Sequence, residues 1–318
     1  MNRRSFLVRA TAFAFAGSCL RSAVLAQAPV RASDAPSGLP APRLTEFFPL
    51  RRGVGYFTGR GGTIGWLSSS GALVAVDTQF PETASQFLAG LPGRGQRKLD
   101  VVFNTHHHGD HTGGNPIFKP ACGMIVAQRK VPFFQLRAAE RVGNLASQVF
   151  ADTLFDDTWR HEFGDEIVTA QYFGPAHTGG DAVISFEKAN VVHMGDLVFN
   201  RIYPVIDLPG GGSIRKWIGA LETVARDYPA DAIYLYGHAN SKFGVSGSRG
   251  DLLVFRDYLS ALLSHVEKGI AAGKTKAQIM TLENMPGFSD FHLPPGKGNR
   301  LPANLEAAYA ELTAGPSA

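Results

Sequence analysis

The chain has 318 residues, of which 44% are hydrophobic and 18% are charged, so it can bury a large core. This composition excludes a mostly disordered or collagen-like chain. Residues 1–26 contain four arginines and no acidic residue, and the remaining residues contain 27 lysines and arginines against 27 aspartates and glutamates. A near-neutral remainder argues against a nucleic-acid-binding protein, which needs a basic surface.

The first 26 residues are typical of an export signal. Arg3 and Arg4 precede the apolar stretch Ala10–Leu20, and small residues follow up to Ala26. The arginine pair followed by Ser-Phe-Leu resembles a twin-arginine signal, which implies export to the periplasm by the twin-arginine export machinery. We expect cleavage after about Ala26. No stable membrane anchor is expected, because a spanning helix needs roughly 20 apolar residues. An ordinary secretory signal is the alternative reading.

Residues 27–45 contain four prolines among small residues, which predicts an extended linker. Residues 46–318 are expected to form a single domain with C-terminal helices. Apolar runs predict strands over 62–67, 72–76, 99–103, 125–127, 167–173, 182–186, 191–194 and 232–236. Helical spacing predicts helices over 82–91, 131–150, 213–228, 251–272 (with Asp251 as the cap) and 303–312. Strands that later alternate with helices indicate α/β layers.

Loss of the signal leaves Cys122 as the only cysteine, so no intramolecular disulfide can form. Cys122 lies in an apolar stretch and is expected to be a small buried hydrophobic residue.

Four of the ten histidines lie within six residues, at positions 106, 107, 108 and 111, with Asp110 among them. They follow the strand predicted over 99–103, so the cluster lies in a loop at the carboxyl end of a strand. His106 and His108 can point the same way, whereas His107 is a spacer that we expect to pack. Imidazoles with a carboxylate suit zinc or iron, and no cysteine is available for a thiolate site.

Three further ligand-type residues each follow an apolar strand: His177, Asp196 and His238. A polar ligand at the end of several strands is expected where strand edges converge on one site.

The pattern His-x-His-x-Asp-His, followed by an isolated His, Asp and His, resembles the motifs of the metallo-β-lactamase superfamily of hydrolases. Asp77, at the end of an apolar strand, matches the aspartate that precedes the motif in that family. The motifs occur in family order over roughly residues 50–245. The resemblance implies an α/β fold, a four-layer αββα sandwich with metals at one edge of the sheets.

The family's ligand positions imply two metal ions here, two Zn²⁺ with iron or manganese as alternatives. The first ion is held by His106, His108 and His177, the second by Asp110, His111 and His238, and Asp196 bridges them. Asp77 orients the metal loop through hydrogen bonds without binding metal.

The resemblance implies an exported di-zinc metallohydrolase that cleaves an acyl bond with a metal-bridging hydroxide. Asp110 is the expected catalytic residue, because it can orient the hydroxide and accept its proton. The substrate is expected to be a small molecule: a lactone, ester, thioester or β-lactam amide. No nucleic acid partner is expected, and the oligomeric state is not predicted.

Two positions indicate which branch of the family this chain resembles. Flavin-linked di-iron members carry a glutamate where this chain has His108, which favours zinc and hydrolysis. Asp196 places the chain in the bridging-aspartate branch, with thioesterases, lactonases and phosphodiesterases, and export argues against a cytosolic glutathione thioester as substrate. One alternative is an iron-dependent oxidoreductase similar to persulfide dioxygenases. A second alternative is true β-lactamase activity as the main function.

The stretch after Asp196 is expected to line the substrate entrance. Asn200 and Tyr203 are candidate hydrogen-bond donors to an oxyanion, and Phe80 and Trp66 are candidates for an apolar wall.

Overall fold

The computed structural model describes residues 45–291 and 298–314, and these residues belong to one compact unit. The export signal predicted over 1–26 lies outside the described residues, as does the linker predicted over 27–45 apart from Thr45. Within the described ranges, no helix has both the length and the apolar character that crossing a membrane requires.

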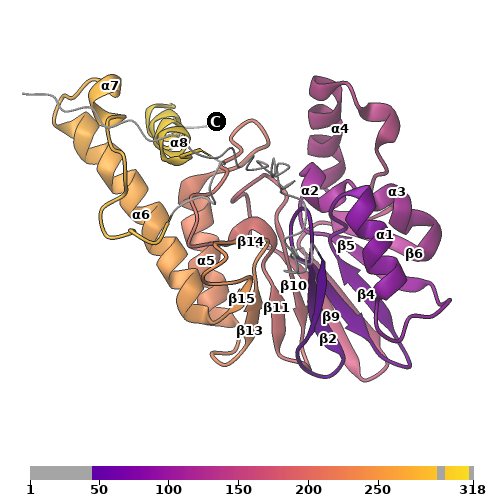
Figure 1. Cartoon of the computed structure of the whole chain (residues 1–318). Helices are drawn as coiled ribbons and strands as arrows, with labels where there is room; N and C mark the ends of the chain where they lie inside the picture. The colour runs from indigo at the N-terminus through magenta and orange to yellow at the C-terminus, as the bar shows by residue number, and fades with distance from the viewer. Residues whose placement is uncertain (1–44, 292–297, 315–318) are drawn as a thin grey trace, which may run out of the picture. The chain divides into compact units, whose positions relative to one another are not determined.

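A seven-stranded sheet forms one central layer (Figure 1). Its strands follow the chain order, with antiparallel pairs from β1 to β4 and parallel pairs from β4 to β7. The strands are β1 (Glu46–Pro49), β2 (Val54–Thr58), β3 (Ile64–Ser68), β4 (Leu73–Val76), β5 (Leu99–Asn104), β6 (Cys122–Gln128) and β7 (Thr153–Phe155). The strands predicted over 62–67 and 72–76 are confirmed as β3 and β4, which form an antiparallel pair. The apolar runs do not predict β1, β2 or β7.

A six-stranded sheet forms the second layer, in the order β15-β13-β11-β10-β9-β8. Its strands pair antiparallel except for β11 and β13, which are parallel. The strands are β8 (Thr158–Phe163), β9 (Glu166–Tyr172), β10 (Ala182–Phe186), β11 (Val191–His193), β13 (Ile233–Leu235) and β15 (Ser246–Gly247). Two short parallel strands, β12 (Phe199–Asn200) and β14 (His238–Ala239), form a separate ladder.

Helices cover the outer face of each sheet: α1 and α3 lie beside the first sheet, and α5 and α6 beside the second (Figure 1). The helices are α1 (Pro81–Gly90), α2 (Gly109–Thr112), α3 (Asn115–Phe118), α4 (Val131–Val142), α5 (Ile214–Asp227), α6 (Arg249–Ala271), α7 (Lys276–Ile279) and α8 (Leu301–Thr313). Three 3₁₀ turns accompany them: η1 (Lys119–Ala121), η2 (Leu145–Ser147) and η3 (Gly195–Leu197).

The buried apolar residues form three clusters that separate the layers. Because side chains alternate along a strand, Val74 of β4 packs toward Ile184 of the other sheet, whereas its neighbour Ala75 packs under α1 with Phe87. A third cluster, which includes Trp217, lies between the second sheet and helices α5 and α6. The layer order is therefore helix, sheet, sheet, helix, and the four-layer αββα sandwich implied by the resemblance is confirmed.

Two helices differ from the predicted ranges. α4 ends at Val142, well before residue 150, because Gly143 takes a left-handed φ of 73° and closes the helix. α6 begins at Arg249 because Ser248 caps it in a capping box. Asp251, predicted as the cap, is the acidic partner in that box, and its carboxylate accepts the backbone N–H of Ser248 at 2.9 Å.

Strand direction brings several strand ends to one edge of the sandwich. β4 and β5 are parallel, as are β11 and β13, so their carboxyl ends lie at the same edge of their respective sheets. Residues that follow these strands can therefore meet although they are far apart in the sequence.

Candidate metal centre

The first sheet supplies four of the ligand-type side chains. His106 and His108 lie in the turn after β5, and Asp110 and His111 lie on the one-turn helix α2 that follows. His106 and His111 are completely buried, whereas the side chain of Asp110 keeps 30% of its surface exposed. This segment therefore presents both buried and accessible ligand atoms.

The second sheet supplies the other three side chains. His177 lies in the loop between β9 and β10, Asp196 in the 3₁₀ turn η3 after β11, and His238 at the start of β14. His177 and Asp196 are buried, and the side chain of His238 is 26% exposed.

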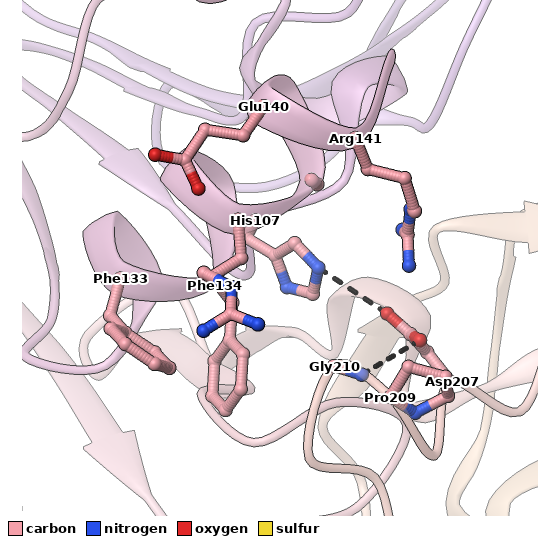
Figure 2. A pocket seen from close by; sticks show the side chains of 10 residues that line it. His107, Phe133, Phe134, Glu140, Arg141, Asp207, Pro209 and Gly210 are labelled. Carbon is pink, nitrogen blue, oxygen red and sulfur yellow. Dashed lines mark hydrogen bonds and ion pairs between the residues drawn. The ribbon is translucent and has the colours of Figure 1, made fainter.

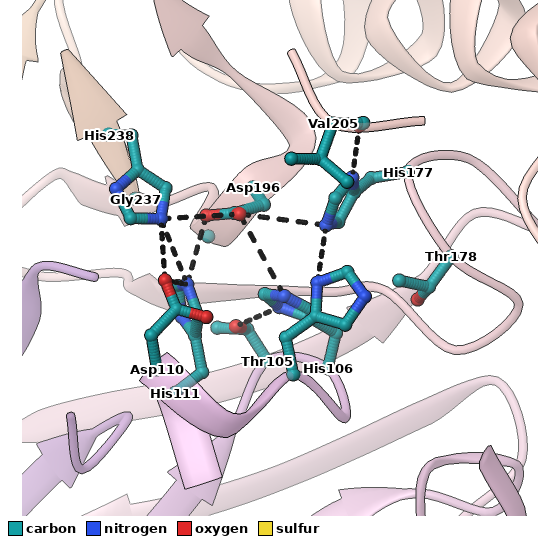
Figure 3. A network of polar contacts seen from close by, with 12 residues as sticks. Thr105, His106, Asp110, His111, His177, Thr178, Asp196, Val205, Gly237 and His238 are labelled. Carbon is teal, nitrogen blue, oxygen red and sulfur yellow. Dashed lines mark hydrogen bonds and ion pairs between the residues drawn. The ribbon is translucent and has the colours of Figure 1, made fainter. Parts of the chain in front are cut away.

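The seven side chains meet in two adjoining groups, and Figure 3 shows how Asp196 lies between His177 and His106 on one side and His111 and His238 on the other. In each group, one ligand atom from every member lies within 4.8 Å of the others. The first group comprises His106, His108, His177 and Asp196, and the second comprises Asp110, His111 and His238. These are the two sets that the family resemblance implies.

Asp196 faces both groups. Its Oδ2 lies 3.5 Å from His177 Nε2, and its Oδ1 lies 3.1 Å from His111 Nε2. A carboxylate in this position can contribute one oxygen to each of two neighbouring cations.

Asp77 orients the histidine loop, residues 105–111, through hydrogen bonds to its first and last residues. Its Oδ1 accepts the Thr105 backbone N–H at 2.8 Å, and its Oδ2 accepts the Thr105 hydroxyl at 2.8 Å and His111 Nδ1–H at 2.7 Å. The Thr105 hydroxyl has thus donated its hydrogen, so its oxygen accepts from His106 Nδ1 at 3.1 Å. Asp77 therefore fixes His111 directly and His106 through Thr105.

The segment 205–207 orients the other two imidazoles of the first group. The Val205 carbonyl accepts His177 Nδ1–H at 2.8 Å, and Asp207 Oδ2 accepts His108 Nε2–H at 2.9 Å. Sequence reasoning misses Asp207, which lies 99 residues from His108 and outside every motif. Only the fold brings the two together.

The inward-facing nitrogens consequently carry lone pairs. Burial lowers the pKa of His177 to about 3, so this ring is neutral, and its single hydrogen lies on Nδ1 against the Val205 carbonyl. His177 Nε2 lies 3.0 Å from His108 Nδ1. Two lone pairs at this distance repel each other unless a proton or a metal cation lies between them.

A metal cation fits this donor set. Buried His106 Nε2 has no hydrogen-bond partner among the described residues, and it points into the same small volume. Imidazole nitrogens backed by carboxylate or carbonyl oxygens are the usual surroundings of zinc and iron in proteins. An unpaired buried nitrogen costs stability, and a cation would remove that cost.

The carboxylates supply the negative charge that such cations require. Burial raises the pKa of Asp196, but the imidazoles of His238 and His111 outweigh it and hold that pKa well below its usual range. Burial has the same effect on Asp110, and again His111 and His238 hold its pKa below the usual range. Burial lowers the pKa of His111, yet Asp196 and Asp77 hold it well above the usual value. Both carboxylates are therefore ionised at neutral pH.

An open cavity of about 740 Å³ gives access to both groups. Asp110 and His238 line it, together with apolar Phe80 and Phe199 and with Arg60 and Arg300. Its size is within the range of small-molecule sites. Phe80 thus forms part of the wall as predicted, whereas Trp66 is buried in the core beside α1.

A second cavity, of about 670 Å³, lies between His107, α4 and the segment 207–210 (Figure 2). His107 and Asp207 line it, with Phe134, Arg137 and Arg141 of α4. His107 Nε2 lies 3.3 Å from Asp207 Oδ2, so this histidine also has a ligand-type neighbour and does more than space the motif.

Asn200 and Tyr203 do not line either of these cavities. Asn200 is buried and donates from Nδ2 to the Gly244 carbonyl at 3.0 Å. The Tyr203 hydroxyl is buried and accepts the Met285 backbone N–H at 3.2 Å. Because both groups are engaged inside the protein, we assign neither of them a contact with an oxyanion.

The fold and the site define a protein of the metal-dependent hydrolase type, with a helix–sheet–sheet–helix sandwich and two ligand groups at one edge. The chain belongs to the metallo-β-lactamase superfamily, whose sequence model matches residues 58–238, more than half of the chain. The predicted family is thus confirmed.

One curated relative is the hydroxyacylglutathione hydrolase of Methylococcus capsulatus, which is 29% identical over 199 residues. The match covers 57% of this chain and 64% of that protein, slightly less than two thirds of its length.

Two solved structures share the fold. The sec-alkylsulfatase Pisa1 from Pseudomonas sp. matches with a TM-score of 0.66 at 15% identity, over 85% of this chain and 50% of that one. A metallo-β-lactamase from Pontibacter korlensis matches with a TM-score of 0.57 at 17% identity, over 68% of this chain and 99% of that one. At these identities the likeness concerns the fold alone.

Proposed function

We propose that this chain is an exported hydrolase that holds two zinc ions and cleaves an acyl bond in a small-molecule substrate. The observation that carries the proposal is the pair of ligand groups on either side of Asp196, at the base of an open cavity. Membership of a hydrolase superfamily supports the reaction type.

Seven side chains would hold the metal ions. The first ion would be held by His106, His108 and His177 and the second by Asp110, His111 and His238, with Asp196 between them. When bound, divalent cations supply Lewis-acid polarisation of a carbonyl and lower the pKa of water toward neutrality. Imidazole and carboxylate ligands without a cysteine suit zinc, and iron or manganese are the alternatives.

Asp110 is the group best placed to hold a proton during the reaction. It is ionised at neutral pH, and its side chain is 30% exposed in the cavity, whereas the side chain of Asp196, which also lines the cavity, is only 4% exposed. His238 Nε2 lies 3.1 Å from Asp110 Oδ2 and fixes the carboxylate in place. Asp110 would therefore orient a water molecule toward the substrate and accept its proton.

The substrate class is an acyl compound: a lactone, ester, thioester or β-lactam amide. The name of the Methylococcus capsulatus relative describes hydrolysis of an acylated thiol, which keeps thioesters among the candidates. The arginine pair and apolar stretch of residues 1–26 support export to the periplasm by the twin-arginine machinery, with removal of the signal after about Ala26.

A substrate screen tests the proposal. The zinc-loaded protein is assayed with a lactone, a thioester, a phosphodiester and a chromogenic cephalosporin, and we expect turnover of at least one acyl compound. Turnover of the phosphodiester alone, or of no compound, would count against acyl hydrolysis. Turnover confined to the cephalosporin would favour the β-lactamase alternative.

Asp110→Asn tests the assigned role, because the amide keeps the shape of the side chain but cannot accept a proton. We expect kcat to fall at least a hundredfold, in the range typical of lost general-base catalysis. The zinc content of the variant is measured alongside, so that loss of metal is distinguished from loss of the proton acceptor. Asp227→Asn, which removes an exposed carboxylate paired with Arg226, is the control. A variant that keeps both its zinc and its activity would show that Asp110 is not the proton acceptor.

A further inference from the structure

Two arginines line the cavity over the metal centre, and the structure gives neither of them a carboxylate partner among the described residues. Seven other arginines of the described chain, for example Arg129 and Arg226, form ion pairs with aspartate or glutamate. Arg60 and Arg300 therefore keep positive charge available at the cavity.

Arg60 is held in place by its surroundings. It lies in the turn between β2 and β3, and its guanidinium carbon lies 4.5 Å above the centre of the Phe80 ring. The turn is fixed to the metal loop, because the Gly62 backbone N–H donates to the Asp110 carbonyl at 3.0 Å. The Arg60 carbonyl also accepts the Thr83 hydroxyl at 3.2 Å. The side chain thus lies at the cavity, and within residues 45–291 and 298–314 no group accepts a hydrogen bond from its guanidinium.

Arg300 approaches the cavity from another part of the chain. It precedes α8, and it is half-buried. One of its terminal nitrogens, Nη1, lies 3.5 Å from the Tyr203 carbonyl, a long contact that leaves the other nitrogen available. The two arginines come from opposite ends of the described chain and line one cavity.

Apart from the two arginines, the cavity is lined by apolar residues, by two acidic residues and by the metal-site histidines His108 and His238. Phe80, Phe199, Ile202 and Val205 supply apolar surface, and the acidic groups are Asp110 and Asp196, which contact histidines. Two divalent cations would carry more positive charge than these two carboxylates carry negative charge, so the two arginines remain uncompensated. A neutral substrate would leave that charge unmatched.

We propose that the substrate of this site carries an anionic group, such as a carboxylate, on an apolar body, and that Arg60 and Arg300 bind that group. The inference rests on the proposed acyl hydrolase function and names its substrate class. Arg60 has the larger role, because Arg300 already contacts a carbonyl. Guanidinium N–H groups bind carboxylates in pairs, which also orients the substrate.

A matched pair of esters tests the proposal on the zinc-loaded protein. The anionic substrate is 4-acetoxybenzoate, and the neutral one is its methyl ester, so the acyl group and the leaving oxygen are the same. We expect the ratio of kcat/KM for the anionic ester to that for the neutral ester to fall about tenfold in Arg60→Gln and by less in Arg300→Gln. A loss of this size is typical when a partly exposed hydrogen bond between charged groups is removed. Arg226→Gln, which removes an exposed arginine paired with Asp227, should leave the ratio unchanged.

A binding measurement separates this proposal from the proposed function. Calorimetry compares 4-acetamidobenzoate with its methyl ester, because these amides lack the reactive ester. We expect the anion to bind more tightly than the methyl ester to the wild-type protein. We expect Arg60→Gln to weaken the affinity for the anion about tenfold. If neither acetoxy ester is hydrolysed but this binding pattern holds, the hydrolase proposal fails for these esters and anion recognition stands.

Two results would overturn the proposal. The first is equal binding of the anion and the neutral ester to the wild-type protein. The second is tighter binding of the anion that neither arginine substitution alters, which would place the carboxylate on the metal ions instead.

Discussion

Four imidazoles of the site, those of His106, His108, His111 and His177, each have an oxygen acceptor at the outer nitrogen, and this contact directs the other nitrogen into the site. Asp77 fixes His111 directly, and it fixes His106 through Thr105. Asp207 fixes His108 through a carboxylate. Removing one acceptor would free a ring to rotate and would change the tautomer that the site needs.

Asp207→Ala tests this dependence at a residue that no motif contains. The His108 ring would lose its only acceptor at Nε2 among the described residues, so we expect zinc affinity to fall between about tenfold and a hundredfold. Competition with a chromophoric chelator measures the affinity. Asp227→Ala, on the surface, is the matched control. Equal zinc affinity in wild type and Asp207→Ala would show that Asp207 does not orient His108.

Gly62→Ala tests how closely the β2–β3 turn approaches the second ligand group. A methyl group at this position would overlap the His111 imidazole, which Asp77 and Asp196 already hold from two sides. We expect a folded protein with weakened zinc binding at that group, checked by chelator competition and thermal unfolding. Gly219→Ala on α5 meets no atom within 4 Å and serves as the control, expected to be neutral or slightly stabilising. Unchanged zinc binding in Gly62→Ala would contradict the close approach.

At the scale of the elements, the C-terminal helix α8 caps α5 through Glu311. Its carboxylate accepts the backbone N–H groups of Ile214 at 2.6 Å and Arg215 at 3.0 Å, and the Ser213 hydroxyl at 2.9 Å. These amides are the unpaired donors of the first turn, where the helix dipole also favours a negative charge. The contact joins α8 to α5.

Glu311→Ala is expected to lower the free energy of unfolding by about 1–2 kcal/mol, as loss of a helix cap and its charge does. Urea denaturation followed by circular dichroism measures the change. Glu306→Ala, on the same helix, removes an exposed ion pair with Lys276 and should cost less than about 0.5 kcal/mol. If Glu311→Ala and Glu306→Ala lower the free energy of unfolding equally, the contact of Glu311 with the first turn of α5 makes no special contribution to stability.

Strong apolar periodicity predicts several of these elements from the sequence. The helix predicted over 213–228 is α5, because its apolar residues recur at helical spacing and Ser213 precedes them. The predicted extension of α4 to residue 150 is wrong, because Gly143 ends the helix locally. Strand β8 escapes prediction, since its residues Trp159, Arg160 and His161 are not buried.

At the scale of the whole molecule, the site exists because two sheets meet at one edge. The first sheet contributes the histidine loop and α2, and the second contributes His177, Asp196 and His238. Neither half contains both complete ligand groups. Packing of the two sheets through their shared core is therefore also the assembly of the metal centre.

The sequence predicts those parts of the site that follow strands and carry a ligand-type side chain, such as Asp196 and His238. It does not predict Asp207 or Arg60, because a lone aspartate or arginine in a loop has no local signal that separates it from a solvated residue. The structure also gives Asn200 and Tyr203 internal hydrogen bonds instead of the predicted place in the cavity. Whether such a side chain lies at the site depends on hydrogen-bond partners that are distant in the sequence.

Anomalous diffraction from crystals of the zinc-loaded protein, recorded on both sides of the zinc absorption edge, tests the central claim most directly. We expect two zinc peaks, one among His106, His108 and His177 and one among Asp110, His111 and His238, with Asp196 contacting both. A single peak, an iron signal in place of zinc, or zinc bound away from these side chains would contradict the two-zinc centre.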